Sequence, residues 1–227
     1  MPIVRIAEKL VYFAHVPKCA GTAIELYLQD RFGPLGLRDA RYLQLSEAMR
    51  WSKSSPQHID AASLGHLLPL SFFSASFAMV RHPATRIHSV FRFQRDIERT
   101  LDPDMPFRDW LDALSGHYER NPFYLDNHPR PMCDFVPEGA TLFRMEAGMS
   151  PVLDWLDGLA GSKEGPRQMI VTNGYHQRLQ RLKAQPGPDL EMTADVKARI
   201  ADLYAADFQR FGYDIDDTEP ATIKVDR

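Results

Sequence analysis

The chain has 227 residues, of which 44% are apolar, and its formal net charge at pH 7 is −3. This length and apolar content suffice for one sizeable hydrophobic core, so we expect a soluble globular protein. The slightly acidic balance argues against a general nucleic-acid binder and against a protein that coats acidic membranes. Any anion-binding site must therefore be local.

The cysteine count and the N-terminal stretch point to a reducing compartment. Cys19 and Cys133 are too few for a disulfide framework, and no Cys/His cluster has the spacing of a metal site. Charges at Arg5, Glu8 and Lys9 interrupt the apolar N-terminal stretch, which argues against a signal peptide. No apolar run reaches the roughly 18 residues of a membrane span. These features predict a cytoplasmic protein with reduced thiols.

Two short apolar runs, at residues 10–14 and 76–80, are each followed by a turn and a helical pattern. Alternation of strand, turn and helix is typical of a parallel α/β sheet. The first predicted helix ends at the Gly33-Pro34 pair, and the second begins with Pro83 in its first turn. The apolar faces of these two helices comprise Ile24, Tyr27, Leu28 and Phe32, and Ile87, Val90, Phe91 and Ile97, respectively.

Residues 100–135 are rich in proline, aspartate, asparagine and aromatic residues, with one short helical run at 107–114. We interpret this region as an irregular helical insertion within a single domain that covers residues 1–227. Its aromatic residues are assigned to core packing, with stacking on sugar rings as the alternative. They are Phe107, Trp110, Tyr118, Phe123 and Tyr124.

The last third of the chain predicts a strand at 140–145, a helix at 150–159, a polar break and one long final helix. Thr193 is the predicted N-cap of the final helix, and Gly212 lies just past its end. Its apolar stripe packs on the core and consists of Val196, Ile200, Leu203, Tyr204, Phe208 and Phe211.

The stretch H-V-P-K-C-A-G-T, residues 15–22, joins the first predicted strand to the first helix. The N–H groups at such a helix start lack partners, and the helix dipole adds positive potential, so the turn suits a phosphate. Small residues allow the backbone to approach the anion, Lys18 adds a charge and Thr22 a hydroxyl. We predict phosphate contacts from Lys18, Cys19, Ala20, Gly21, Thr22 and Ala23.

Two other chemistries are conceivable for this loop. The magnesium-nucleotide loop places its lysine directly before the hydroxyl residue, whereas Lys18 precedes Thr22 by four positions. A phosphatase that uses Cys19 as nucleophile would need an arginine to close the same loop, and none follows. We therefore interpret Cys19 as a small side chain packed under the turn.

A second basic element, V-R-H-P-A-T-R-I-H-S, spans residues 80–89. An arginine at a strand end and a serine on the following helix can converge on one phosphate. We assign this role to Arg81 and Ser89, and interpret three arginines further along the chain as ordinary surface residues. These are Arg92, Arg95 and Arg99.

The two elements, in this order, resemble the 5′-phosphosulfate loop and the 3′-phosphate motif of the sulfotransferases. Residues 143–148 and 203–214 are similar to segments of bacterial and Golgi-type carbohydrate sulfotransferases, whereas 100–130 and 160–190 match poorly. The resemblance implies a P-loop-like three-layer α/β fold with a central parallel sheet flanked by helices. It also implies 3′-phosphoadenosine 5′-phosphosulfate as donor, a hydroxylated acceptor such as a glycan, and no metal.

The resemblance further implies that Lys18 neutralises charge on the bridging oxygen as the nucleotide leaves. The acceptor hydroxyl needs a base, and a neutral histidine suits this task near pH 7. His66 is assigned this role because the segment L-G-H-L-L resembles the one that carries the catalytic histidine of hexuronyl 2-O-sulfotransferases. His15 and Glu146 are the alternatives, and the adenine contacts are expected within residues 173–188.

Two rival functions remain open from the sequence. A kinase-like phosphotransferase would depend on magnesium and prefer ATP. A non-catalytic module would bind the nucleotide or a glycan without transferring a group.

Overall fold

The computed structural model describes residues 2–170 and 174–217. A four-stranded sheet with the order β1-β2-β3-β4 forms its centre. The strands span Ile3–Ile6 (β1), Lys9–Ala14 (β2), Ala75–Val80 (β3) and Thr141–Arg144 (β4). β2, β3 and β4 are parallel, with Phe13 beside Phe77 and Phe77 beside Thr141, so their carboxyl ends lie at one edge of the sheet. The predicted α/β class is confirmed.

The first strand was not predicted, and it makes the sheet mixed rather than wholly parallel. β1 pairs antiparallel with β2, with Ile3 opposite Tyr12. Val4 and Ile6 are buried while Arg5 is exposed, so the charged residue occupies the outward face of a strand with a period of two. The charges that argue against a signal peptide are thus also compatible with an edge strand.

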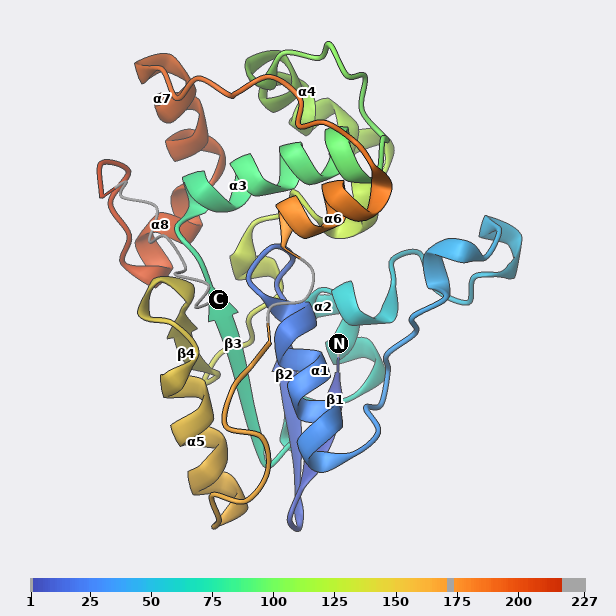
Figure 1. Cartoon of the computed structure of the whole chain (residues 1–227), viewed down its shortest axis with the longest axis vertical. Helices are drawn as coiled ribbons and strands as arrows, with labels where there is room; N and C mark the ends of the chain where they lie inside the picture. Colours follow the sequence, from blue (N-terminus) through green and yellow to red (C-terminus); the bar gives the residue numbers. More distant parts are fainter. Residues whose placement is uncertain (1, 171–173, 218–227) are drawn as a thin grey trace.

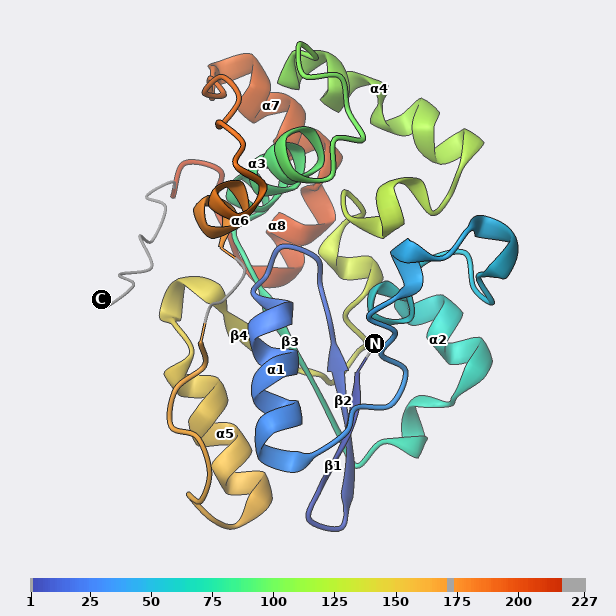
Figure 2. The same cartoon turned by 45° about the vertical axis from the view of Figure 1, so that its right-hand side comes forward.

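Each parallel strand leads into a helix, as the sequence predicts. These helices are α1 (Gly21–Phe32), α3 (Pro83–Arg92) and α5 (Ser150–Ala160). α1 and α5 lie along the sheet, whereas α3 lies beyond the carboxyl ends of the strands (Figures 1 and 2). The main core is apolar and includes Phe13, Phe77, Ile24, Leu28 and Leu156.

A second apolar cluster lies between α3, α4 (Phe107–Arg120) and α7 (Ala194–Leu203), away from the sheet. Phe107 and Trp110 are buried in it, which confirms core packing for these two aromatic residues. Three further helices, α2 (Ala61–Leu67), α6 (Tyr175–Leu182) and α8 (Ala205–Phe211), complete the set of α-helices in the described ranges. α3, α4, α6 and α7 gather beyond the strand ends (Figures 1 and 2).

The predicted single final helix is wrong, because the chain breaks at Tyr204 into α7 and α8. Tyr204 has φ −117° and ψ 24°, outside the helical region. Its hydroxyl donates to the carbonyl of Pro129, and Asp207 in α8 accepts two N–H groups of a neighbouring segment. Thr193 stands at the predicted N-cap position, but its hydroxyl contacts the side chain of Asp195 and does not cap the helix. Gly212 ends α8 with φ +63°, as predicted.

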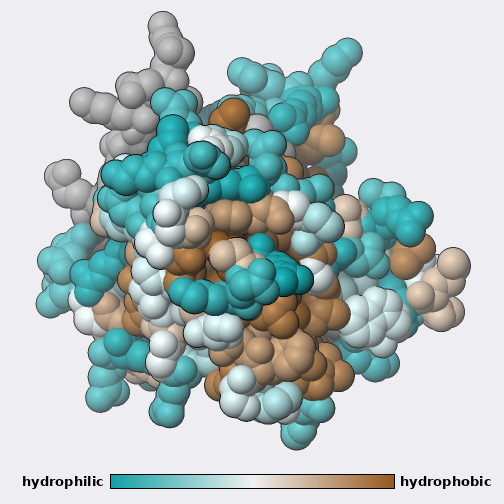
Figure 3. Space-filling view, turned by 90° about the horizontal axis from the view of Figure 1, so that it is seen from below, coloured by the Kyte–Doolittle hydropathy of each residue, from teal (hydrophilic) through white to brown (hydrophobic). Residues whose placement is uncertain are grey.

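The end of the molecule opposite the strand carboxyl ends shows a broad apolar surface (Figure 3). None of the helices in the described part of the chain is long and apolar enough to span a bilayer.

Candidate active site

The loop between β2 and α1 carries the first predicted phosphate element. Lys18 and Ala20 both adopt left-handed backbone conformations, with φ of 66° and 58°, on either side of Cys19. Alternation of left- and right-handed residues turns successive N–H groups into an anion-binding concavity. At the start of α1, the N–H groups of Ala23 and Ile24 donate to the carbonyl of Ala20, whereas those of Gly21 and Thr22 have no main-chain acceptor among the described residues. The loop therefore presents main-chain donors at the amino end of a three-turn helix.

Gly21 is required here by a close approach of the His15 ring. A Cβ atom on Gly21 would lie 2.0 Å from Nε2 of His15. Nδ1 of His15 donates to Glu25 at 2.5 Å, and Glu25 also accepts from Nε of Arg38 at 3.0 Å. Burial alone would raise the pKa of Glu25, but His15 and Arg38 outweigh burial and bring it to about 2. The His15 ring thus packs against Gly21 and supports the loop.

Lys18 carries an ammonium that lacks an acidic partner. Its Nζ lies 3.8 Å above the centre of the Phe93 ring, and no carboxylate of the described residues forms an ion pair with it. Burial, and then the charges of Arg178 and Arg81, lower the pKa of Lys18 to about 7. A bound anion at this point would reverse that effect, because it would favour the charged ammonium.

Cys19 is buried, and burial raises the pKa of its thiol to about 12. Cys19 does not line the cavity described below. These observations agree with a packed side chain and argue against a thiolate nucleophile.

The second phosphate element meets the first because β2 and β3 are neighbours and parallel. Arg81 donates from Nε to the Thr85 hydroxyl at 3.1 Å and from Nη1 to the carbonyl of Lys18 at 3.4 Å. The guanidinium therefore bridges the two elements. Ser89, two turns into α3, lines the same cavity. Ligands of open α/β sheets bind at this edge, outside the carboxyl ends of the strands.

The cavity between these elements has a volume of about 770 Å³, within the range of small-molecule sites. Of the predicted phosphate contacts, all but Cys19 line it, namely Lys18, Ala20, Gly21, Thr22, Ala23, Arg81 and Ser89. The structure thus brings together two motifs that are separated by about 60 residues in the sequence.

Helix α6 closes one side of the cavity with Tyr175, His176 and Arg178. These residues lie in the range 173–188, where adenine contacts are predicted; residue 173 itself lies outside the described residues. Arg92 also lines the cavity, with its guanidinium 4.0 Å from the Tyr175 ring centre. Its interpretation as an ordinary surface arginine is wrong. Arg95 is buried too, and it pairs with Asp96 at 2.7 Å.

Another part of the cavity wall holds a histidine and carboxylate group that the sequence did not reveal. Nδ1 of His58 lies 2.8 Å from Oδ2 of Asp126, and the His58 ring contacts the rings of His15 and His128, each with centroids 4.8 Å apart. Burial would raise the pKa of Asp126, but His58 outweighs burial and lowers it. The ionised carboxylate only accepts, so His58 donates to it from Nδ1, and Nε2 lies on the other edge of the ring.

His128 is the third histidine of this group. Its Nδ1 donates to the carbonyl of Leu125 at 2.8 Å, which leaves Nε2 unprotonated. Burial, and then the charge of His58, lower the pKa of His128 to about 3. Its ring stacks on Phe93, which lies under the Lys18 ammonium. The histidine group is therefore contiguous with the phosphate loop.

The two remaining predicted bases lie elsewhere. His66 is exposed on α2 and does not line the cavity. Glu146 accepts the N–H of His82 at 2.7 Å and the Tyr213 hydroxyl at 3.0 Å. Its carboxylate therefore supports the start of α3, and the cavity wall at this point is formed by Met145 instead.

His58, Asp126 and His128 offer ligand atoms within 4.8 Å of one another, and histidine and carboxylate are common ligands of zinc and similar ions. The Asp126 carboxylate is already occupied, since it accepts the Ser55 N–H at 2.6 Å, the Ser55 hydroxyl at 2.7 Å and His58. This hydrogen bonding favours an acid and histidine pair over a metal centre. The expectation that no metal takes part stays a prediction.

A family model described as the sulfotransferase family matches residues 3–214 of the chain. Searches of curated proteins and of solved structures give no significant match. The matched range includes both phosphate elements and the segments that carry His58 and Asp126.

Proposed function

The chain belongs to the sulfotransferase family, and from this premise we propose that it transfers a sulfuryl group from 3′-phosphoadenosine 5′-phosphosulfate to a hydroxyl of a carbohydrate. One observation carries the donor assignment. Lys18 and Arg81 face one cavity at a helix amino end, and neither forms an ion pair among the described residues. A ligand with several negative charges would neutralise both. Support for a carbohydrate acceptor comes from the resemblance alone.

The donor, when bound, supplies an activated sulfuryl group. We propose that Lys18 neutralises the bridging oxygen as its bond to sulfur breaks, and that Arg81 and Ser89 hold the 3′-phosphate. Sulfuryl transfer, like phosphoryl transfer, depends mainly on such positioning and charge stabilisation. We propose Tyr175, His176 and Arg178 of α6 for the nucleoside side of the donor.

We propose His58, rather than His66, as the base. Asp126 holds the His58 ring by Nδ1, which leaves Nε2 to accept the proton of the acceptor hydroxyl as the hydroxyl oxygen bonds to sulfur. This is the arrangement of a general base that a carboxylate orients. His15 is less suited, because its Nε2 packs against Gly21.

The first experiment measures thermal stabilisation by adenosine 3′,5′-bisphosphate, and by ATP with magnesium, on the wild type and Arg81→Ala. A ligand at 100 times its Kd stabilises the folded state by about 2.7 kcal/mol. We expect a shift with the bisphosphate that Arg81→Ala largely loses, since a charge-assisted bond contributes about 1.5–3 kcal/mol. A shift with magnesium-ATP alone would favour a kinase.

The second experiment supplies labelled donor with a panel of glycans and simple alcohols, with and without a chelator. Transfer that continues with the chelator supports the metal-free scheme. Bisphosphate binding without transfer to any acceptor would support the non-catalytic module instead.

A further inference from the structure

The segment that carries Asp126 has an unusual backbone. Leu125, Asp126 and Asn127 are three successive non-glycine residues with positive φ, at 51°, 55° and 65°. Aspartate and asparagine tolerate this conformation better than other non-glycine residues, so the steric strain is greatest at Leu125. Such strain persists only where the surroundings hold it, and it gathers at functional sites. The question is what holds this segment.

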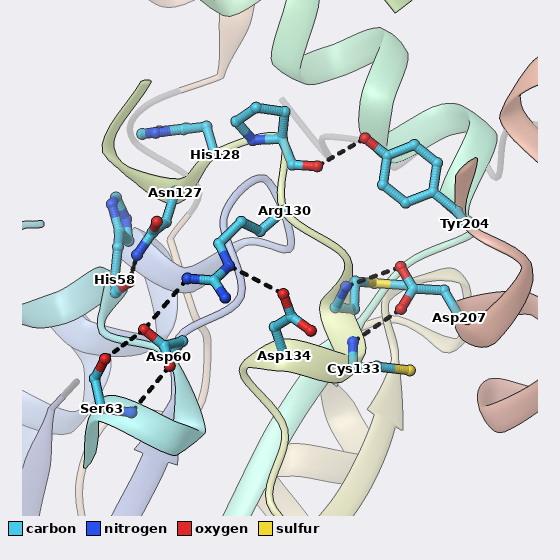
Figure 4. Close-up of polar contacts among 12 residues, drawn as sticks. His58, Asp60, Ser63, Asn127, His128, Arg130, Cys133, Asp134, Tyr204 and Asp207 are labelled. Carbon is cyan, nitrogen blue, oxygen red and sulfur yellow. Dashed lines mark hydrogen bonds and ion pairs between the residues drawn. The ribbon is translucent and has the colours of Figure 1, made fainter. Parts of the chain in front are cut away.

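On one side, the segment is bound to the chain around His58. Asp126 accepts from Ser55 and His58, as described above, and Asn127 is fully buried and donates from Nδ2 to the carbonyl of His58 at 2.9 Å. Figure 4 shows Asn127 between His58 and His128. These contacts fix the position of the Asp126 carboxylate. They do not explain what restrains residues 128–130, which follow it.

On the other side, three successive carbonyls are held by two side chains. Arg86 donates from Nη1 to the carbonyl of His128 at 3.0 Å and from Nη2 to that of Arg130 at 2.6 Å. Tyr204 donates to the carbonyl between them, that of Pro129, at 2.7 Å. Figure 4 shows Tyr204 in this contact and, below it in the view, Asp207, which accepts the main-chain N–H of Cys133. The guanidinium of Arg86 also lies over the Tyr204 ring, 5.5 Å from its centre.

Arg86 is a costly residue for this task. Its side chain is fully buried, its Nε has no partner, and it forms no ion pair with any carboxylate in residues 2–170 and 174–217. Burial of a charge costs free energy that well-packed apolar residues would not incur. A neutral side chain could pack at this position without that cost. The guanidinium of an arginine, in contrast, carries several N–H donors in a fixed plane, so it can bind two carbonyls at once.

We propose that Arg86 is a positioning residue, which clamps the carbonyls of His128 and Arg130 and so keeps Asp126 on His58. Arg86 belongs to α3, the helix that also carries Ser89, so the clamp joins the helix of the donor site to the segment of the base. Its catalytic consequence rests on the proposed function, because it requires His58 to be the base.

The test is a nuclear magnetic resonance measurement of the His58 ring in the full chain. A ring N–H that donates to a carboxylate gives a strongly downfield proton signal, and the signal is assigned by its loss in His58→Asn. Three groups face the ring, namely Asp126, His15 and His128. We expect Asp126→Asn and Arg86→Lys both to lose the signal, since lysine cannot hold two carbonyls in the same geometry.

Arg31→Lys is the matched control. Arg31 is also a buried arginine, but it pairs with Asp157 at 2.7 Å and does not line the cavity. It should lower the melting temperature and keep the His58 signal. If Arg86→Lys does not fold, Tyr204→Phe, which removes only the Pro129 contact, should weaken or broaden the signal. A signal that survives in Arg86→Lys, or that is unchanged in Tyr204→Phe where Arg86→Lys does not fold, would overturn the proposal.

A double-mutant cycle extends the test to turnover. We expect Arg86→Lys to lower kcat by about tenfold or more and to change the Kd of the bisphosphate by less than about twofold. In the Asp126→Asn background, Arg86→Lys should not lower kcat any further, because both substitutions disrupt the same contact between Asp126 and His58. An equal loss in both backgrounds would show a merely structural role. A normal His58 signal in a wild type that transfers no group would contradict the proposed function and leave the clamp intact.

Discussion

The two sides of the cavity are built in different ways. On the donor side, cations outnumber acids, and Lys18 and Arg81 have no carboxylate partner among the described residues. On the base side, each histidine donates from Nδ1 to an oxygen, of Glu25, Asp126 or a main-chain carbonyl. The proposed donor side thus carries unpaired positive charge, whereas the histidines of the proposed base side are already hydrogen-bonded and oriented. The unpaired positive charge indicates that an anion binds, and the hydrogen-bonded histidines indicate which ring nitrogen can accept a proton.

The largest expected effect comes from the base side. His58→Asn should lower kcat by roughly 10²–10⁴-fold, the usual contribution of a positioned general base. The Kd of adenosine 3′,5′-bisphosphate should stay unchanged, because the proposed contacts to its phosphates come from the loop, Arg81 and Ser89 and not from His58. Steady-state kinetics with the best acceptor and calorimetry with the bisphosphate separate the two quantities.

His66→Asn is the control for this prediction. His66 is exposed and does not line the cavity, so the variant should keep wild-type kcat. Full turnover in His58→Asn together with loss in His66→Asn would return the role of base to His66.

The donor side should show a pH dependence of intermediate size. Because the pKa of Lys18 is lowered to about 7, bisphosphate binding above that pH must take up a proton. The affinity should therefore fall by up to about tenfold per pH unit above pH 7. Calorimetry between pH 6.5 and 9 measures this slope, which Lys18→Met should abolish.

The same lowered pKa has a consequence for stability. The unfolded chain binds the Lys18 proton up to its ordinary pKa of about 10.4, and the folded chain releases it from about 7. The contribution of Lys18 to the free energy of unfolding should therefore rise with pH between these values. Lys197→Met changes a lysine that does not line the cavity. It should leave the pH dependence of the bisphosphate affinity and that of the free energy of unfolding as they are in the wild type.

The smallest expected effect comes from a substitution in the loop between β2 and α1. Gly21→Ala places a Cβ 2.0 Å from His15, and such overpacking costs about 1–3 kcal/mol of unfolding free energy. Gly158→Ala, in a helix with open space around it, should instead stabilise by about 0.5–1 kcal/mol. Chemical denaturation measures both. Addition of His15→Ala to Gly21→Ala should recover part of the loss, and no recovery would contradict the packing argument.

Much of the donor side could be predicted from the sequence because its information is local. A strand end, a turn and a helix start lie within about ten residues of one another, and main-chain N–H groups supply much of the predicted binding. Parallel pairing of the two strands then brings Lys18 and Arg81 together. The edge strand Ile3–Ile6 is not evident from the sequence, because in so short a segment the alternation of Val4, Arg5 and Ile6 cannot be distinguished from a charge that interrupts an apolar run.

The proposed base could not be predicted in this way. His58 lies in a short 3₁₀ turn and Asp126 in a strained segment nearly 70 residues later, and neither has a periodic or motif signal. The break at Tyr204 was missed for a related reason. The apolar stripe continues through it, but distant carbonyl and N–H groups hold Tyr204 and Asp207.

The sequence by itself determined the strand-to-helix order, the two phosphate elements and the family to which they point, since these depend on neighbours along the chain. Only the tertiary structure decided which histidine meets a carboxylate beside the phosphate loop, and that the buried Arg86 holds the segment of Asp126. Those contacts join residues from separate segments, and their energetics depend on burial and geometry that no local pattern encodes.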